Sequence, residues 1–166
     1  HDRTQRWAII VAHRRAGKTV ATINDVIKRS LEKPGLYGYI APYYVQAKDV
    51  AFGYFKRFTA PLIDYGCTYN ESELRINLPN GSVIRLYGAD NYDRLRGLGF
   101  DGLVLDEAAD FPPQAWAEVL RPSLADKKGW CVWIGTPKGH NSFWETWERA
   151  QEEDGWYSLR LRASET

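Results

Sequence analysis

Two short groups of residues have the types and spacing needed for phosphate chemistry. The first precedes a predicted amphipathic helix and follows a short apolar run of the kind found in buried strands. It fits a phosphate-binding loop except at its first position, where alanine stands and glycine is usual. In such a loop, backbone N–H groups and the helix N-terminus point at phosphate oxygens. The members of this loop are Ala12, His13, Arg14, Arg15, Ala16, Gly17, Lys18 and Thr19.

Three positions of the loop have distinct expected roles. Gly17 allows the backbone to approach the phosphates closely. Lys18 would reach the β- and γ-phosphates of ATP, and the hydroxyl of Thr19 would bind Mg²⁺. A chance Gly-Lys-Thr at a helix start is the alternative, and the strand before it and the helix after it argue against that. His13 is a conceivable catalytic base, although a space-filling loop histidine explains it better.

The second group is the acid pair Asp106 and Glu107, which follows the apolar run Leu103-Val104-Leu105. In ATPases with a phosphate-binding loop, an aspartate at such a strand end holds Mg²⁺, and a following glutamate can polarise the attacking water as general base. A solvated turn or a helix cap is the alternative, but the loop upstream favours the catalytic interpretation. A kinase-like enzyme is disfavoured because the glutamate is typical of enzymes that activate water.

A third candidate is the turn that begins at Gly135 and Thr136, after the strand predicted for residues 130–134. A threonine at this place could sense the γ-phosphate. The turn preferences of Gly-Thr-Pro explain the residues equally well.

The elements that must position these groups alternate between strand and helix, which predicts an α/β domain with a mostly parallel sheet flanked by helices. Asn80-Gly81 lies between two alternating runs and predicts a β-hairpin near residues 73–88. The predicted strands are 7–12, 36–41, 73–78, 82–87, 103–105, 130–134 and 156–161, and the predicted helices are 17–31, 45–59, 113–120 and 142–150.

Composition sets the outer limits. The 166 residues suffice for one domain, which we place at 1–166, and the net charge of +1 gives no argument for a nucleic-acid or membrane partner. Cys67 and Cys131 are expected to be packed thiols, and no apolar run approaches the roughly 20 residues of a membrane span. Methionine is absent, even at position 1, so we expect a piece of a longer protein.

Taken together, these residues resemble the ATPase domain of the large terminase subunit of tailed bacteriophages. The loop of residues 12–19 looks like that family's arginine-rich phosphate loop, which also accepts a residue other than glycine at its first position. The further matches are Ala41–Lys48, Leu95–Gly97, Val119–Leu124 and Gly135–Gly139, the last being similar to the family's coupling motif.

The resemblance implies a motor that hydrolyses ATP with Mg²⁺ to move double-stranded DNA into an empty procapsid. It implies a P-loop fold of the additional-strand type, in which the strand leading to Gly135 and Thr136 lies between the loop strand and the acid-pair strand, so that Thr136 couples the γ-phosphate to the DNA-moving parts. It also implies a homo-oligomeric ring in the host cytoplasm, docked transiently on the portal, with a small terminase subunit as partner. The N-terminal flank and the C-terminal nuclease domain of the family are expected to be absent from this piece.

Two residue assignments stay open. An arginine finger could be Arg14 or Arg15 acting in cis, or Arg96 acting on a neighbouring subunit's nucleotide in trans, and for each the alternative is a surface ion pair. The adenine-contacting glutamine of the family normally lies upstream of the first strand, and Gln5 is close to that strand without settling the assignment.

Two other functions compete with the packaging motor. A helicase-like translocase would need a second ATPase-like domain downstream. A nucleotide-binding assembly module that does not hydrolyse ATP would usually have lost the general base, and the intact Glu107 argues against it.

Overall fold

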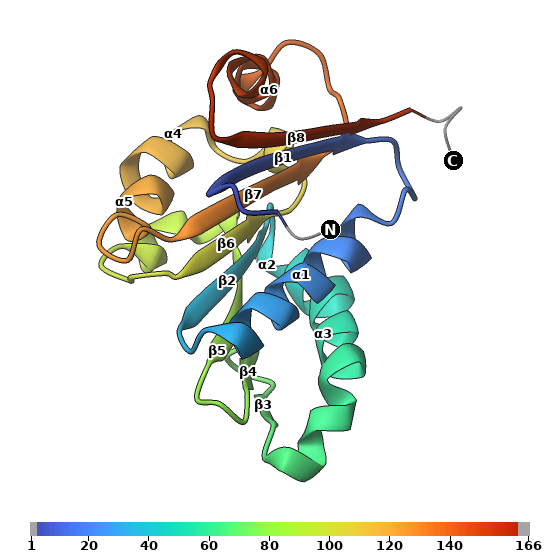
Figure 1. Ribbon diagram of the computed structural model, residues 1–166, viewed down its shortest axis with the longest axis vertical. Helices are drawn as coiled ribbons and strands as arrows, with labels where there is room; N and C mark the ends of the chain where they lie inside the picture. Colours follow the sequence, from blue (N-terminus) through green and yellow to red (C-terminus); the bar gives the residue numbers. More distant parts are fainter. Residues whose placement is uncertain (1–2, 163–166) are drawn as a thin grey trace.

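One mostly parallel sheet organises the chain. The computed structural model describes residues 3–162, so that residues 1–2 and 163–166 of the expected 1–166 domain lie outside it. Within the described residues, eight strands form the sheet in the order β3-β4-β5-β2-β6-β7-β1-β8 (Figure 1). The strands are β1 (Trp7–Ala12), β2 (Leu36–Ala41), β3 (Thr68–Asn70), β4 (Arg75–Asn77), β5 (Val83–Gly88), β6 (Gly102–Leu105), β7 (Trp130–Gly135) and β8 (Trp156–Leu161).

Helices cover both faces of the sheet, which confirms the predicted α/β class. On one face, α1 and α3 pack on the buried side chains of the strands; on the other face lie α4 to α6 with η5 (Figure 1). The helical elements are α1 (Lys18–Glu32), α2 (Tyr44–Gln46), η1 (Ala47–Ala51), α3 (Phe52–Thr59), η2 (Ala60–Tyr65), η3 (Ala89–Leu95), η4 (Ala108–Asp110), α4 (Pro113–Ala115), η5 (Trp116–Leu120), α5 (Arg121–Ser123) and α6 (Ser142–Glu152). The predicted helices 45–59 and 113–120 each contain a π-helical turn, η1 and η5 respectively.

The central strands bring the candidate residues to one edge of the sheet. β7 pairs in parallel with β1 on one side and with β6 on the other. The strand that leads to Gly135 therefore lies between the loop strand and the acid-pair strand, as expected for the additional-strand type of P-loop fold. Because the carboxyl ends of parallel strands meet at one edge, the three groups that follow β1, β6 and β7 are neighbours.

The predicted hairpin is confirmed, but it is larger than a two-residue turn. β4 and β5 are antiparallel, with Asn77 opposite Val83, and Gly81 lies in the connection at a φ of 88°. The Asn80 side chain accepts a hydrogen bond from the Ser82 N–H at 3.0 Å and donates to the Ser30 carbonyl of α1 at 2.8 Å. Strand β3 was missed, because three residues are too few to show an alternating pattern.

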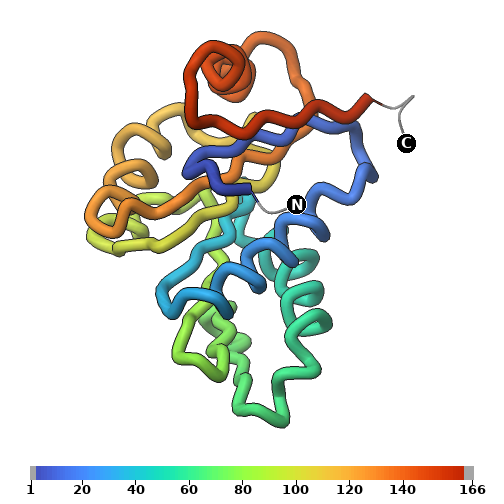
Figure 2. The backbone as a smooth tube through the Cα atoms, viewed as in Figure 1, coloured from blue at the N-terminus to red at the C-terminus, as the bar shows by residue number. Residues whose placement is uncertain are grey.

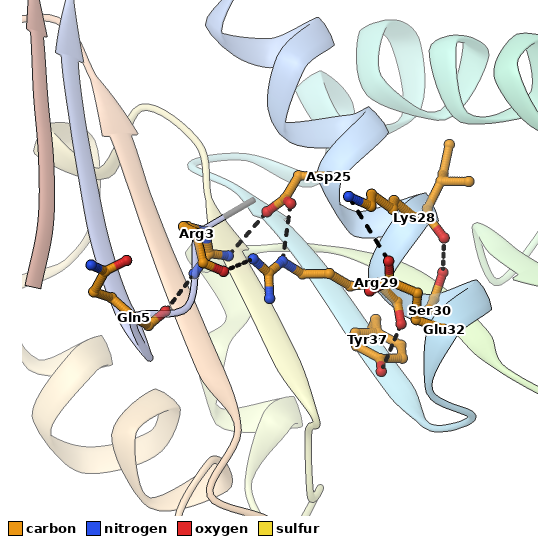
Figure 3. Close-up of polar contacts among 9 residues, drawn as sticks. Arg3, Gln5, Asp25, Lys28, Arg29, Ser30, Glu32 and Tyr37 are labelled. Atoms are coloured by element: carbon orange, nitrogen blue, oxygen red, sulfur yellow. Dashed lines mark hydrogen bonds and ion pairs between the residues drawn. The ribbon is translucent and has the colours of Figure 1, made fainter. Parts of the chain in front are cut away.

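The segment before β1 is tied to α1 by a small charged network. Arg3 and Arg29 each bond one carboxylate oxygen of Asp25 at 3.0 Å, and Arg29 also donates to the Arg3 carbonyl at 2.8 Å (Figure 3). This network holds α1 against the amino-terminal end of β1, which is the end away from the phosphate loop.

Candidate active site

The loop between β1 and α1 makes a wide turn, seen at the right of the backbone trace in Figure 2. Two of its residues have a left-handed backbone, Arg15 at a φ of 66° and Gly17 at a φ of 75°. Ala12 is the last residue of β1, its side chain is buried in the core, and its φ is not positive. The first position of this loop therefore does not require glycine, because the unusual backbone geometry falls on Arg15 and Gly17 instead.

Lys18 spans this turn from the first position of α1. Its side chain is buried, and its ammonium donates to the carbonyls of Ala12 at 3.0 Å and His13 at 2.9 Å. The helix itself begins without a cap: Gly17 offers no side-chain acceptor, and no acidic residue stands in the first turn. The N–H groups of this turn and the lysine ammonium together make a site that favours an anion.

Asp106 faces the start of α1. Its Oδ2 lies 3.5 Å from the Thr19 hydroxyl, and its backbone N–H donates to the Ile40 carbonyl of β2 at 2.8 Å. Among the described residues its Oδ1 is buried without a hydrogen-bond partner. Burial raises the pKa of Asp106, a shift that a hydrogen bond from Tyr39 opposes and the charge of Glu107 reinforces.

Tyr39 is the residue of this site that sequence reasoning missed. It is fully buried in β2, and its hydroxyl donates a hydrogen bond to Oδ2 of Asp106. Burial, followed by the charge of Asp106, holds the pKa of Tyr39 well above its ordinary value, so that it remains a donor. The only sequence signal was a pair of hydroxyl-bearing residues, Tyr37 and Tyr39, inside a strand that is otherwise apolar, Leu-Tyr-Gly-Tyr-Ile-Ala.

Glu107 turns away from the direction of β6. Its φ and ψ are both 48°, a left-handed conformation that is unfavourable for any residue with a side chain. The following turn is closed by a hydrogen bond of 2.9 Å from the Asp110 N–H to the Glu107 carbonyl. The carboxylates of the adjacent residues Asp106 and Glu107 therefore point in different directions, which would allow one to bind a metal and the other to act as a base. Strain of this kind is concentrated at functional sites.

Thr136 follows β7 at the same edge. Its hydroxyl oxygen is buried and has no hydrogen-bond partner among the described residues. Two residues further on, Lys138 binds both carboxylate oxygens of Asp110 at 2.6 and 2.7 Å. The turn after β7 is thus connected directly to the turn that follows Glu107.

The three candidate arginines occupy different settings. Arg14 and Arg15 are exposed in the loop, and no ion pair joins their side chains to another described residue. Arg96 is exposed and forms ion pairs with Asp93 at 2.8 Å and Glu118 at 3.3 Å. The hydrogen bond from Arg96 to Asp93 is the main cause that raises the pKa of its guanidinium. Within the single chain, Arg96 therefore forms surface ion pairs, which was the alternative to its role as an arginine finger.

Gln5 lies at the other end of β1 from the phosphate loop. Its backbone carbonyl accepts a hydrogen bond of 3.0 Å from Arg3 (Figure 3). The six residues of β1 separate Gln5 from the end of the strand that leads into the phosphate loop, a distance of roughly 20 Å at the rise of a strand. The adenine contact stays unassigned.

The oxygens of Thr19 and Asp106 fit Mg²⁺, a hard cation that prefers oxygen ligands. The buried Oδ1 of Asp106 is uncommitted, and the Thr19 hydroxyl is close to the same carboxylate. No cluster of three or more His, Cys, Asp or Glu side chains occurs in the described part of the chain.

Two further expectations concern the rest of the chain. Cys67 and Cys131 are both buried and free, as predicted for packed thiols. No helix within residues 3–162 is long and apolar enough to cross a bilayer.

Comparisons with known proteins converge on one family. Residues 9–165 match the family described as "Terminase large subunit, T4likevirus-type, N-terminal". The large terminase subunit of Thermus virus P23-45 is 31% identical over 164 residues, covering 87% of this chain and 34% of that protein. The solved "Large Terminase ATPase domain" of Thermus phage P74-26 is similar at a TM-score of 0.81 and 27% identity, covering 99% of this chain and 78% of that one.

A more distant structure shares the fold. It is the large terminase of a thermophilic bacteriophage, solved in complex with ADP, and it is similar at a TM-score of 0.77 and 16% identity, covering 95% of this chain and 40% of that one. The chain spans about a third of the length of the curated relatives that it matches over most of its own length.

Proposed function

This chain belongs to the terminase large subunit family, and from that membership and the site we propose that it is an ATPase motor domain that drives double-stranded viral DNA into a procapsid. One observation carries the catalytic part: the Thr19 hydroxyl of the loop lies 3.5 Å from Asp106, and Glu107 follows in a left-handed turn. A candidate metal ligand and a candidate base are thus neighbours of the proposed phosphate-binding loop.

The loop residues would bind the nucleotide. The Lys18 ammonium exchanges its two carbonyl partners for phosphate oxygens, and the first-turn N–H groups of α1 donate to the same phosphates. Arg14, exposed in the same loop, would stabilise negative charge in the transition state. The terminase of the thermophilic bacteriophage, which has this fold, was solved with ADP, and that supports a nucleotide as the ligand.

Thr19 and Asp106 would hold Mg²⁺, which supplies charge neutralisation for the β- and γ-phosphates when it is bound. Glu107 would accept a proton from the attacking water as its oxygen forms a bond to the γ-phosphorus and the bond to the bridging oxygen breaks. Thr136, whose hydroxyl is uncommitted at the same edge, would respond to the γ-phosphate and transmit the change through the turn that contains Lys138.

The same proposal includes DNA translocation, a homo-oligomeric ring, the portal protein and the small terminase subunit as partners, and the host cytoplasm as location. It rests on family membership, and the chain spans about a third of the length of its matching relative. Arg96 is proposed as the trans finger of such a ring. Its ion pairs with Asp93 and Glu118 would have to open for that role. A helicase-like translocase is not favoured, since family membership points to packaging.

The decisive variant is Glu107→Gln, which keeps the size of the side chain and removes the base. We expect ATP turnover to fall by about 10²-fold or more, while the affinity for a fluorescent ADP analogue changes less than twofold. Glu148→Gln on the exposed face of α6 is the matched control and should behave like the wild type. Equal turnover in Glu107→Gln would refute the assignment of the base. Failure of the wild-type chain to bind nucleotide would refute the proposed function as a whole.

A further inference from the structure

Tyr39 makes a contact that the proposed mechanism does not use. Its side chain leaves β2 on the face covered by α1 and α3, and its ring meets that of Phe55 edge to face at 5.5 Å. Tyr39 is opposite Val104 in the parallel pairing of β2 with β6, two residues before Asp106. From this place its hydroxyl donates to Oδ2 of Asp106.

The two oxygens of the Asp106 carboxylate have unequal surroundings. Oδ2 accepts the hydrogen bond from Tyr39 and lies 3.5 Å from the Thr19 hydroxyl. Oδ1 is buried and has no partner within the described residues. Leaving a buried carboxylate oxygen unpaired costs free energy. A buried tyrosine hydroxyl needs only one acceptor, and Tyr39 could have found one elsewhere in the core. The bond from Tyr39 therefore fixes the orientation of the carboxylate.

The direction of approach matters as well. β6 lies between β2 and β7, so Tyr39 reaches Asp106 from the side opposite to the strand that leads to Thr136 and to the loop strand β1. A donor in this place restrains rotation of the carboxylate, and the Tyr39 hydroxyl also lies within hydrogen-bonding reach of the Thr19 hydroxyl. Groups that bond a metal-binding carboxylate in this way orient it, and their loss typically lowers metal affinity by about 10–100-fold.

Resting on the proposed ATPase function, we propose that Tyr39 is a positioning residue for Mg²⁺: its hydroxyl fixes the orientation of the Asp106 carboxylate beside the Thr19 hydroxyl, where the hydrated metal of the nucleotide complex would bind. Tyr39 does not itself touch nucleotide or metal. Its effect acts through Asp106 and concerns the metal rather than the phosphates.

The same strand supplies a matched control. Tyr37 is buried on the same face of β2, but its hydroxyl lies at the opposite end of the strand. There it donates to the Lys33 carbonyl at 2.7 Å. It also lies 3.4 Å from the Arg29 carbonyl, as Figure 3 shows. Removing the hydroxyl from Tyr37 or from Tyr39 thus deletes a buried hydrogen-bond donor in each case. Only the second deletion involves Asp106.

The experiment compares Tyr39→Phe, Tyr37→Phe and the wild type by binding of a fluorescent ADP analogue, first in EDTA and then across a Mg²⁺ titration. We expect equal affinities in EDTA for all three. The Mg²⁺ concentration at half effect should rise about tenfold or more in Tyr39→Phe and stay within twofold in Tyr37→Phe. A merely structural role of Tyr39 would lower the melting temperature and leave this concentration unchanged, which would overturn the proposal.

A second measurement covers the case in which Tyr39→Phe is poorly folded. Asp106→Asn removes the carboxylate and therefore the effect of Mg²⁺ on nucleotide binding. Adding Tyr39→Phe to this variant should change nucleotide binding no further. An additional loss in the double variant would show that Tyr39 acts elsewhere. If the wild type binds nucleotide without any effect of Mg²⁺, the proposed metal site fails and this inference falls with it. A normal Mg²⁺ effect in both the wild type and Tyr39→Phe refutes Tyr39 alone.

Discussion

The left-handed backbone at Glu107 makes a prediction that concerns stability rather than catalysis. Replacing Glu107 by alanine removes the carboxylate and leaves the unfavourable φ of 48°. Replacing it by glycine removes both, because glycine adopts positive φ readily. The two variants lose the same base, so their difference isolates the backbone.

The magnitude follows from two opposing contributions. A residue with a Cβ in the left-handed region costs about 1–2 kcal/mol, and glycine loses about 0.4–1 kcal/mol more than alanine in chain entropy on folding. Glu107→Gly should therefore be more stable than Glu107→Ala by about 0.8 kcal/mol. For a chain of this size that is a difference of about 2–3 °C in melting temperature.

Urea unfolding and thermal melts of the two variants test this prediction, and Glu148 in the middle of α6 supplies the control. At Glu148 the usual order should hold, with alanine more stable than glycine by about 1 kcal/mol. Both Glu107 variants should lack ATP turnover. If Glu107→Ala equals or exceeds Glu107→Gly in stability, the argument from backbone strain is wrong.

Three further predictions concern charged residues. Burial alone would raise the pKa of Asp101, but hydrogen bonds from the Leu36 N–H, Lys33 and Lys127 outweigh it and lower that pKa. This carboxylate therefore stabilises the fold above its unfolded pKa of about 4. Asp101→Asn should lose about 1–3 kcal/mol in urea unfolding at pH 7 and approach the wild type as pH falls through the lowered pKa; a constant gap would contradict this. Arg96→Ala should reduce ATP turnover only in the assembled ring, and an equal defect in a dilute monomer would exclude action in trans. Asp106→Asn should raise the melting temperature of the nucleotide-free chain while abolishing turnover, because it removes the free-energy cost of burying a charged carboxylate that has an unpartnered oxygen. A lower melting temperature would argue against such a cost.

The features predictable from sequence were those with local or periodic signals. The apolar run before Ala12, the helical spacing of Val20, Ile23 and Ile27, and the pair Asn80-Gly81 each depend on neighbours within a few residues, and each element is present. The position of β7 between β6 and β1 came from family resemblance, since strand order is not written in any local pattern.

The features that were missed depend on contacts between distant segments. The partner of Tyr39 is set by the register of β2 against β6, which no spacing within either strand reveals. The ion pairs of Arg96 with Glu118 and of Lys138 with Asp110 likewise join residues of separate elements.

The uncapped start of α1 has a consequence for local folding. Helix ends usually satisfy their first N–H groups with a side chain, a contribution of about 1 kcal/mol, and here none does so. A bound phosphate would complete the helix as a cap would. Amide protons of the first turn near Thr19 should thus exchange rapidly with solvent in the free chain and slowly with nucleotide, whereas those at Ile23 and Ile27, packed in the core, should be protected in both states. The nucleotide would then complete the structure of α1 as well as serve as the substrate of the proposed ATPase.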